Sequence, residues 1–233
     1  MSVFLGRYVL LACLLPQVCL AGAASIDPRA ESLYQQAVPY LQQANSKLEA
    51  VPADMPTAST EDKQRGLLLI DQAGALMRPA MGLLEQAAAL QHPVAEYRLA
   101  LIYVMLYPSE EVKAKACPLL EHSLTQGFAP AALEISSWCL PFTDTPQYQA
   151  ALHAVEDAMP AYAQYFPQPV VGLECRREQP QGLAMQWGSS RDYQAEIYRL
   201  LGDSNRAQRQ AFYQKALDIN DCYKAKRRMA IAQ

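Results

Sequence analysis

The chain has little glycine, few histidines and no excess of charge of one sign. Its 233 residues include 10 glycines, and 51% are hydrophobic, which excludes collagen-like and disordered chains. The 20 basic and 23 acidic residues give a net charge of -3. A nucleic-acid-binding protein usually has a basic excess, so we expect no nucleic-acid partner. The length is sufficient for one or two domains with a buried core.

Motifs of catalysis, cofactor binding and metal binding are also missing. The sequence contains no HExxH, P-loop or GxGxxG motif, and no GxSxG or SxxK in a suitable setting. We interpret His92, His122 and His153 as surface or packing residues, because none has a visible catalytic partner. Glu174 likewise has no visible partner, and no two cysteines have CxxC spacing. We therefore expect a protein that is not an enzyme and holds neither a cofactor nor a metal ion.

Residues 1–23 have the organisation of a secretory signal peptide. Arg7 precedes an apolar run, and Ala21 and Ala23 satisfy the Ala-x-Ala rule for cleavage. We expect cleavage after Ala23, with Ala24 as the alternative, and a periplasmic or secreted mature protein. The apolar run is too short and too broken for a membrane anchor, which needs about 20 apolar residues. We see no later run of that length, so we expect no membrane span.

The cysteines divide between this signal and the mature chain. Leu10–Cys13 resembles the lipobox of a lipoprotein, but cleavage there would leave too few apolar residues after Arg7 for a signal. An even number of cysteines in the mature part of an exported protein predicts two disulfides. Three pairings are possible, and the alternative is four buried free thiols. The four cysteines are Cys117, Cys139, Cys175 and Cys222.

Apolar residues recur at helical spacing along most of the chain, which predicts about nine or ten helices. Pro39 and Pro118 fall inside helical patterns and are expected to kink or split those helices. Residues 51–59 and 166–181 are expected to be loops, and residues 167–173 are the one candidate strand. Capping residues or prolines that favour a helix start occur at Asp27-Pro28, Thr60, Ser109, Thr145-Pro146 and Asp203-Ser204.

Part of the helical region repeats at an offset of 36 residues. The segment 83–95, LLEQAAALQHPVA, aligns with 119–131, LLEHSLTQGFAPA, and a looser copy begins near Phe212. A fixed period predicts stacked helical hairpins that bury one another's faces. The alternative is an irregular helical bundle in which the repeat is accidental. The identical positions in the first copy are Leu83, Leu84, Glu85 and Ala95.

The pattern resembles the Sel1-like repeat, a relative of the tetratricopeptide repeat with two antiparallel helices in each unit. Its signature is matched by residues 84–87, Leu-Glu-Gln-Ala, and by Ala95-x-x-x-Leu99-Ala100-x-x-Tyr103. The match is firm over 79–140 and loose over 190–233, and His92 stands near where a turn glycine is usual. The resemblance implies an all-α superhelix, or solenoid, of helix hairpins with an irregular loop segment. We therefore divide the mature chain into an N-terminal helix and linker at 24–60, repeats at 61–165, and a loop segment with repeat-like helices at 166–233.

The hairpin arrangement also selects a disulfide pairing. In a hairpin that turns at residues 126–128, Cys117 lies 11 residues before Phe128 and Cys139 lies 11 residues after it. Antiparallel helices place the two cysteines level, as the short Cα–Cα distance of a disulfide requires. We therefore expect a Cys117–Cys139 bridge. Cys175–Cys222 then follows as the second bridge, which would pin the irregular loop to the last helix.

Two sets of residues are candidates for contact with a partner. Aromatic residues fall on the second helices of the two best repeats; most are expected to pack between repeats and a minority to line a binding face. These are Tyr97, Tyr103, Tyr107 and Trp138. The most basic stretch is 224–228, KAKRR, with Arg206 and Arg209 upstream. We favour the interpretation that these cations complement the end of a helix dipole, and the alternative is a site for an acidic partner or an anionic membrane.

Two functions are compatible with this sequence. Exported Sel1-like proteins commonly act as interaction scaffolds, so the resemblance implies a non-enzymatic adaptor that binds an unknown protein of the bacterial envelope. The alternative is an exported hydrolase or binding protein for cell-wall material or β-lactams, with its site in residues 166–187. Hydrolysis needs an acid–base pair, so the test is whether His153, Glu174 and a serine share a pocket.

Overall fold

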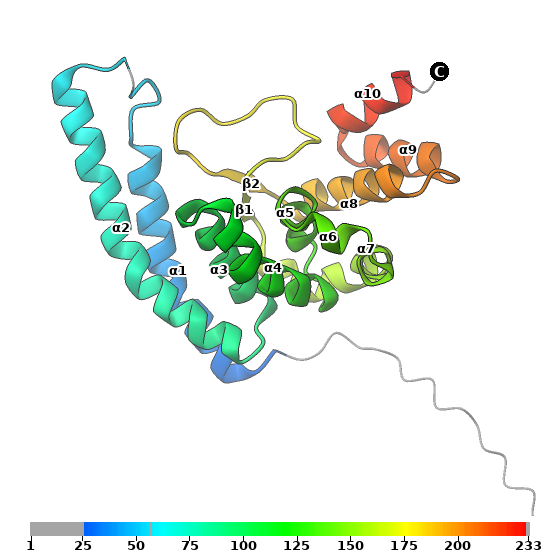
Figure 1. Ribbon diagram of the computed structural model, residues 1–233, viewed down its shortest axis with the longest axis horizontal. Helices are drawn as coiled ribbons and strands as arrows, with labels where there is room; N and C mark the ends of the chain where they lie inside the picture. Colours follow the sequence, from blue (N-terminus) through cyan, green and yellow to red (C-terminus); the bar gives the residue numbers. More distant parts are fainter. Residues whose placement is uncertain (1–25, 56, 232–233) are drawn as a thin grey trace, which may run out of the picture.

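The computed structural model describes residues 26–55 and 57–231. The expected signal peptide, its cleavage after Ala23 and the Leu10–Cys13 segment lie outside the described residues. Within these ranges the chain forms ten α-helices, one 3-10 helix and one two-stranded sheet, so the expected all-α class is confirmed (Figure 1). The elements are α1 (Pro28–Glu49), α2 (Thr60–Ala89), α3 (Pro93–Leu106), α4 (Ser109–Thr125), α5 (Pro130–Trp138), α6 (Leu140–Thr143), α7 (Pro146–Ala158), η1 (Met159–Tyr165), β1 (Gln168–Val170), β2 (Gln186–Gly188), α8 (Ser190–Ser204), α9 (Arg209–Asn220) and α10 (Tyr223–Ile231).

Side-chain caps begin several helices where the sequence predicts them. The side chains of Asp27 and Thr145 accept backbone hydrogen bonds from the first turns of α1 and α7. α2 begins at Thr60, but its capping side chain is that of Ser59, and α4 begins at Ser109 without a side-chain cap. The predicted start at Asp203-Ser204 is wrong, because these residues end α8 and α9 begins at Arg209. The Asp203 carboxylate is used instead for side-chain contacts within the C-terminal helices.

The interior prolines do not split their helices. α1 continues through Pro39, α4 continues through Pro118, and α2 continues through Pro79. All three prolines are exposed. A carbonyl that loses its helical N–H partner on the solvent side can bind water instead, so the expected splitting does not occur.

The two longest helices, α1 and α2, form an antiparallel hairpin that we call the arm (Figure 1). Small residues line the contact between them: Ala37 and Ala44 of α1, and Ala73 and Ala80 of α2, are all buried. Their size lets the two helix backbones approach closely. In Figure 1 the arm projects to one side of the remaining helices, so much of α2 has a neighbour on only one face.

One helix of the arm meets a length-and-composition criterion for a membrane span. α2 has one stretch that is long and apolar enough to cross a membrane by length and composition, although only 17% of that stretch is buried. We expected no apolar run long enough to span a membrane after residue 23. By the test of length and composition that expectation is wrong. Such a helix is weak evidence for a membrane span, because helices of soluble proteins pass the same test.

Two helix–helix turns, between α2 and α3 and between α4 and α5, reproduce the 36-residue offset. Gln91 and Gly127 occupy equivalent positions and both have positive φ, 61° and 91°. At the first turn the N–H of His92 donates to the carbonyl of Ala87, and at the second the N–H of Phe128 donates to that of Ser123. The same backbone motif therefore ends α2 and α4 and directs α3 and α5 back along them. Gln91, not His92, occupies the position where the repeat signature has glycine.

The turn at Gly127 brings the first pair of cysteines together. Cys117 and Cys139 form a disulfide with a Cα–Cα distance of 5.6 Å, and Cys175 and Cys222 form a second with 4.1 Å. Both predicted pairings are confirmed. Two disulfides are typical of proteins in an oxidising, extracytoplasmic compartment.

A small sheet closes the core beside α8. β1 pairs with β2 in antiparallel register, with Pro169 opposite Trp187, and β1 lies within the predicted strand 167–173. The hydroxyls of Tyr97 and Tyr193 both donate to the carbonyl of Pro169, at 2.5 and 3.1 Å. Both tyrosines are 0% exposed, so they fasten β1 to α3 and α8 from inside the core.

Candidate functional site

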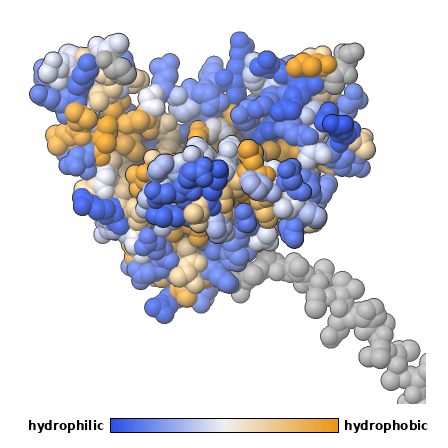
Figure 2. Space-filling view, in the orientation of Figure 1, coloured by the Kyte–Doolittle hydropathy of each residue, from blue (hydrophilic) through white to orange (hydrophobic). Residues whose placement is uncertain are grey.

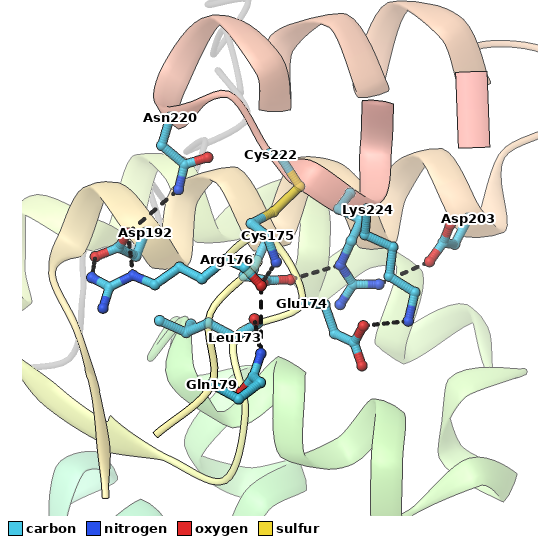
Figure 3. The surroundings of a disulfide bond; sticks show 12 residues. Leu173, Glu174, Cys175, Arg176, Gln179, Asp192, Asp203, Asn220, Cys222 and Lys224 are labelled. Carbon is cyan, nitrogen blue, oxygen red and sulfur yellow. Dashed lines mark hydrogen bonds and ion pairs between the residues drawn. A yellow bond between two sulfur atoms is a disulfide. The ribbon is translucent and has the colours of Figure 1, made fainter. Parts of the chain in front are cut away.

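The segment between β1 and β2 folds back onto the last helices and is fixed there by the Cys175–Cys222 disulfide (Figure 3). The N–H of Tyr223 donates to the carbonyl of Cys175 at 2.9 Å. The N–H of Cys175 in turn donates to the Glu196 carboxylate of α8 at 2.5 Å. One bridge and two backbone hydrogen bonds therefore hold the segment at the start of α10.

A buried ion pair on α8 supports this junction. The Arg199 guanidinium donates to Glu196 at 2.6 Å and to Asp203 at 2.9 Å. Glu196 and Arg199 are both buried, and burial raises the pKa of the Glu196 carboxyl against the opposing effect of Arg199. The Asp203 carboxylate also pairs with Arg228 of α10, 3.2 Å away. These contacts tie α10 to α8 independently of the disulfide.

Glu174, which has no visible partner in the sequence, forms an ion pair with Lys224 of α10 (Figure 3). The two charged groups are 2.5 Å apart. Burial by itself would raise the pKa of Glu174, but Lys224, Arg199 and Arg228 outweigh it and lower the pKa below its usual value. The carboxylate is therefore ionised at neutral pH and neutralises one cation of α10.

Around this junction lies a cleft of about 910 Å³, which we call the cationic cleft. Six cations and a single carboxylate, that of Glu174, are among its lining residues. The apolar part of the wall comes from Tyr213, Tyr223 and Ile231. The six cations are Arg176, Arg177, Arg209, Lys224, Arg227 and Arg228.

Within residues 26–55 and 57–231, half of these cations have no carboxylate partner. Among the described residues, no carboxylate lies within ion-pair distance of Arg177, Arg209 or Arg227. Arg177 and Arg227 instead lie over the ring of Tyr223, at 6.0 and 5.7 Å from its centre. The remaining cations are paired with Asp192, Glu174 and Asp203. The cleft thus combines uncompensated positive charge with an aromatic surface, a combination that attracts carboxylates and other anions.

Sequence reasoning identified only part of this cleft. Lys224, Arg227, Arg228 and Arg209 belong to the basic stretch and its upstream neighbours, whereas Arg176 and Arg177 were missed. A signal for them exists in the sequence. Both follow Cys175 directly, and the predicted bridge to Cys222 places them beside Lys224.

The four aromatic candidates do not line the cationic cleft. Tyr97 is fully buried and cannot touch a partner, so it is a packing residue. Tyr103 is half-buried and donates to Glu85 at 3.2 Å, and the ammonium of Lys115 lies 3.8 Å from the ring centre of Tyr107. The fourth candidate, Trp138, is half-buried and packs against the core.

The residues considered for hydrolysis are not brought together. His153 lines a pocket with Phe212, whereas Glu174 lines the cationic cleft. His92 is buried and hydrogen-bonded to Glu31 at 3.0 Å, and burial lowers its pKa. His122 pairs with Glu96 at 2.7 Å. The described residues contain no group of three or more metal-ligating side chains close enough to hold an ion.

The groove between the arm and α3 is much smaller. It has a volume of about 50 Å³ and is lined by apolar residues, among them Trp187, together with Asn45 and Arg98. The buried guanidinium of Arg98 lies 5.4 Å from the ring centre of Trp187. Burial lowers the pKa of Arg98. A space of this size holds only a few water molecules, so it does not compete with the cationic cleft as a site for a partner.

One buried carboxyl makes stability depend on pH. Glu134 of α5 is 2% exposed, and burial raises its pKa to about 7 despite a hydrogen bond from the N–H of Val171 at 3.1 Å. The folded state holds the Glu134 proton more tightly than the unfolded state does. The contribution of Glu134 to the free energy of unfolding is therefore full at low pH and is lost as pH rises through 7. Between pH 5 and 8 we expect the free energy of unfolding to fall by roughly 2 kcal/mol from this group.

The variant Glu134→Gln isolates this effect, because glutamine still accepts the Val171 hydrogen bond but does not ionise. Urea unfolding of both proteins across this pH range is the measurement. The variant should gain stability relative to the native chain as pH rises. A constant difference between the two would contradict the raised pKa.

Comparison of the chain with family models, with curated proteins and with solved structures gave no match. The interpretation of the site therefore depends on its own geometry. Its main features are the uncompensated arginines and the bridge that fixes them.

Proposed function

We propose that the protein is an exported, non-enzymatic helical-repeat adaptor of the bacterial envelope, periplasmic or secreted, which binds an acidic segment of a partner protein. The observation that carries this proposal is the cationic cleft with its three arginines that lack a carboxylate partner among the described residues. The predicted signal peptide and the two disulfides support the location.

The chemistry of the cleft favours a peptide over a small anion. Its volume of about 910 Å³ is far larger than a phosphate or a single carboxylate needs. Arginine binds carboxylates through two parallel hydrogen bonds, and tyrosine and arginine are frequent in the hot spots of protein interfaces. A segment with several carboxylates and an apolar or aromatic residue satisfies both the arginines and Tyr223.

The helical-repeat part of the proposal is supported by the equivalent turns at Gln91 and Gly127. Equivalent turns 36 residues apart are what a Sel1-like array requires, because each hairpin must pack on its neighbour in the same way. In such an array the hairpins form a rigid support, and the disulfide pre-organises the cleft at its C-terminal end. Pre-organisation increases affinity because less conformational freedom is lost on binding.

The proposal predicts that an acidic peptide binds in the cleft and depends on the unpaired arginines. The probe is a fluorescein-labelled oligoglutamate peptide, titrated with the mature chain and followed by fluorescence anisotropy. The triple variant Arg177→Gln, Arg209→Gln, Arg227→Gln should weaken binding about 100-fold, because each of the three charge-assisted contacts contributes of the order of 1 kcal/mol.

A control variant separates a local effect from that of net charge. Arg29→Gln, Arg65→Gln and Lys113→Gln remove the same total charge from exposed positions on α1, α2 and α4. This control should bind the peptide within about twofold of the native chain if the cleft is the site. Equal weakening by both triple variants would show that the peptide responds only to overall charge, and the proposed site would be wrong.

A further inference from the structure

The arm presents a helix face that the rest of the chain leaves uncovered. α1 packs on the side of α2 that carries Gly66, Ala73 and Ala80, all buried. At 100° per residue, the opposite side of the helix carries a second set, which we call the outward face. It consists of Leu67, Leu68, Asp71, Ala75, Arg78 and Gly82. Figure 2 shows hydrophobic side chains gathered over the arm.

The outward face is apolar at its ends and charged near its middle. Leu67 is 61% exposed and Leu68 is 56% exposed. Within residues 66–84 the only charged residues are Asp71 and Arg78. Neither makes an ion pair or a side-chain hydrogen bond with another described residue. Both charges are exposed, so a partner that covers the leucines also has to supply a group of opposite charge for each of them.

Two glycines in this part of α2 have no role in packing the single chain. A Cβ added at Gly74 or at Gly82 would meet no atom within 4 Å. Glycine inside a helix is destabilising relative to alanine, so its presence at a position with open space needs a reason outside the chain. Contact with another helix backbone at short distance is such a reason.

We propose that the outward face binds a second copy of the chain, with the two α2 helices antiparallel about a two-fold axis between Gly74 and Ala75. Asp71 and Arg78 lie equally far from this axis, so Asp71 of each copy faces Arg78 of the other. The same register places Leu67 opposite Gly82, where open space receives the leucine side chain. The contact from Leu67 to Gly82 extends over about 24 Å, and the same surface serves both copies, as a closed dimer requires.

The charges favour a second copy over a lipid bilayer. Hydrocarbon would cover the leucines but would leave Asp71 and Arg78 without partners, which is costly. The antiparallel register neutralises all four charges of the pair of helices. The dimer is independent of the cationic cleft, which lies on α9, α10 and the segment before β2.

Sedimentation velocity of the mature chain, with its disulfides intact, tests the dimer over a concentration series. We expect a monomer–dimer equilibrium in the native chain. Asp71→Arg and Arg78→Asp each place like charges opposite one another and should weaken dimerisation about 10-fold or more. The double variant with both substitutions restores opposite pairs and should recover the native affinity.

Controls make the outcome decisive. Lys113→Asp changes the charge by the same amount on α4 and should leave the dimer unchanged. A Cβ at Gly74 meets no atom of its own chain within 4 Å and the position is exposed, so Gly74→Leu should keep the native circular dichroism spectrum while abolishing the dimer. Sedimentation as a monomer at every concentration would overturn the proposal, and so would a dimer whose affinity is the same in both single charge variants. Binding to phosphatidylcholine vesicles without dimerisation would show that the face binds lipid and would overturn it as well.

Discussion

Replacing Cys175 and Cys222 together with alanine is expected to lower the free energy of unfolding by about 4 kcal/mol. The bridge joins residues separated by 47 positions, so its loss releases a long loop in the unfolded state. In the folded state, loss of the bridge frees the segment that carries Arg176 and Arg177 from the start of α10. Urea unfolding of the variant and of the native chain measures the first effect, and the anisotropy titration with the oligoglutamate peptide measures the second.

The chain contains its own matched control for this prediction. Replacing Cys117 and Cys139 with alanine removes a bridge that spans 22 positions and should cost about 3 kcal/mol. This bridge joins α4 to the end of α5, and neither cysteine lines the cationic cleft. Both double variants should therefore be less stable, but only the Cys175/Cys222 variant should lose affinity for the peptide. The same loss of affinity in both would show that the cleft does not depend on its local bridge.

Ala87→Phe is expected to destabilise the protein by at least about 3 kcal/mol, because overpacking of a closed helix contact displaces both helices. Ala87 is 0% exposed near the end of α2 and belongs to the repeated segment that packs beside α3. For a chain of this size the change corresponds to a fall in melting temperature of about 6–12 °C. Thermal unfolding followed by circular dichroism measures it.

Ala89→Phe is the control, because Ala89 lies in the same helix but is exposed. This variant should melt within about 2 °C of the native chain, since surface substitutions usually change stability by less than 0.5 kcal/mol. If Ala87→Phe also kept the native melting temperature, the assignment of this segment to a stacked repeat would be wrong.

Local patterns in the sequence predicted much of the fold. The periodicity of apolar residues gave the helices, and the repeat gave the hairpin whose turn at Gly127 brings Cys117 level with Cys139. Caps such as Asp27 and Thr145 were recognised because their side chains bond to backbone groups a few residues away. These signals are short-range, so one sequence is enough to interpret them.

Contacts between distant segments account for what the sequence left unresolved. The partner of Glu174 is Lys224, and the two residues are 50 positions apart in the chain. Asp203 resembles a helix cap in the sequence, but its carboxylate accepts from Tyr213 of α9 and pairs with Arg228 of α10. The strand β2 was also missed, because its three residues carry no periodic pattern and are ordered by pairing with β1.

Affinity capture from the envelope fraction of the native host tests the central claim most directly. The mature chain, the triple variant at Arg177, Arg209 and Arg227, and the triple control at Arg29, Arg65 and Lys113 are used as baits under non-reducing conditions, and captured proteins are identified by mass spectrometry. We predict one stoichiometric partner with an acidic segment, captured by the native chain and by the control but not by the cleft variant. Capture of the same proteins in equal amounts by all three baits would contradict an adaptor that works through the cationic cleft.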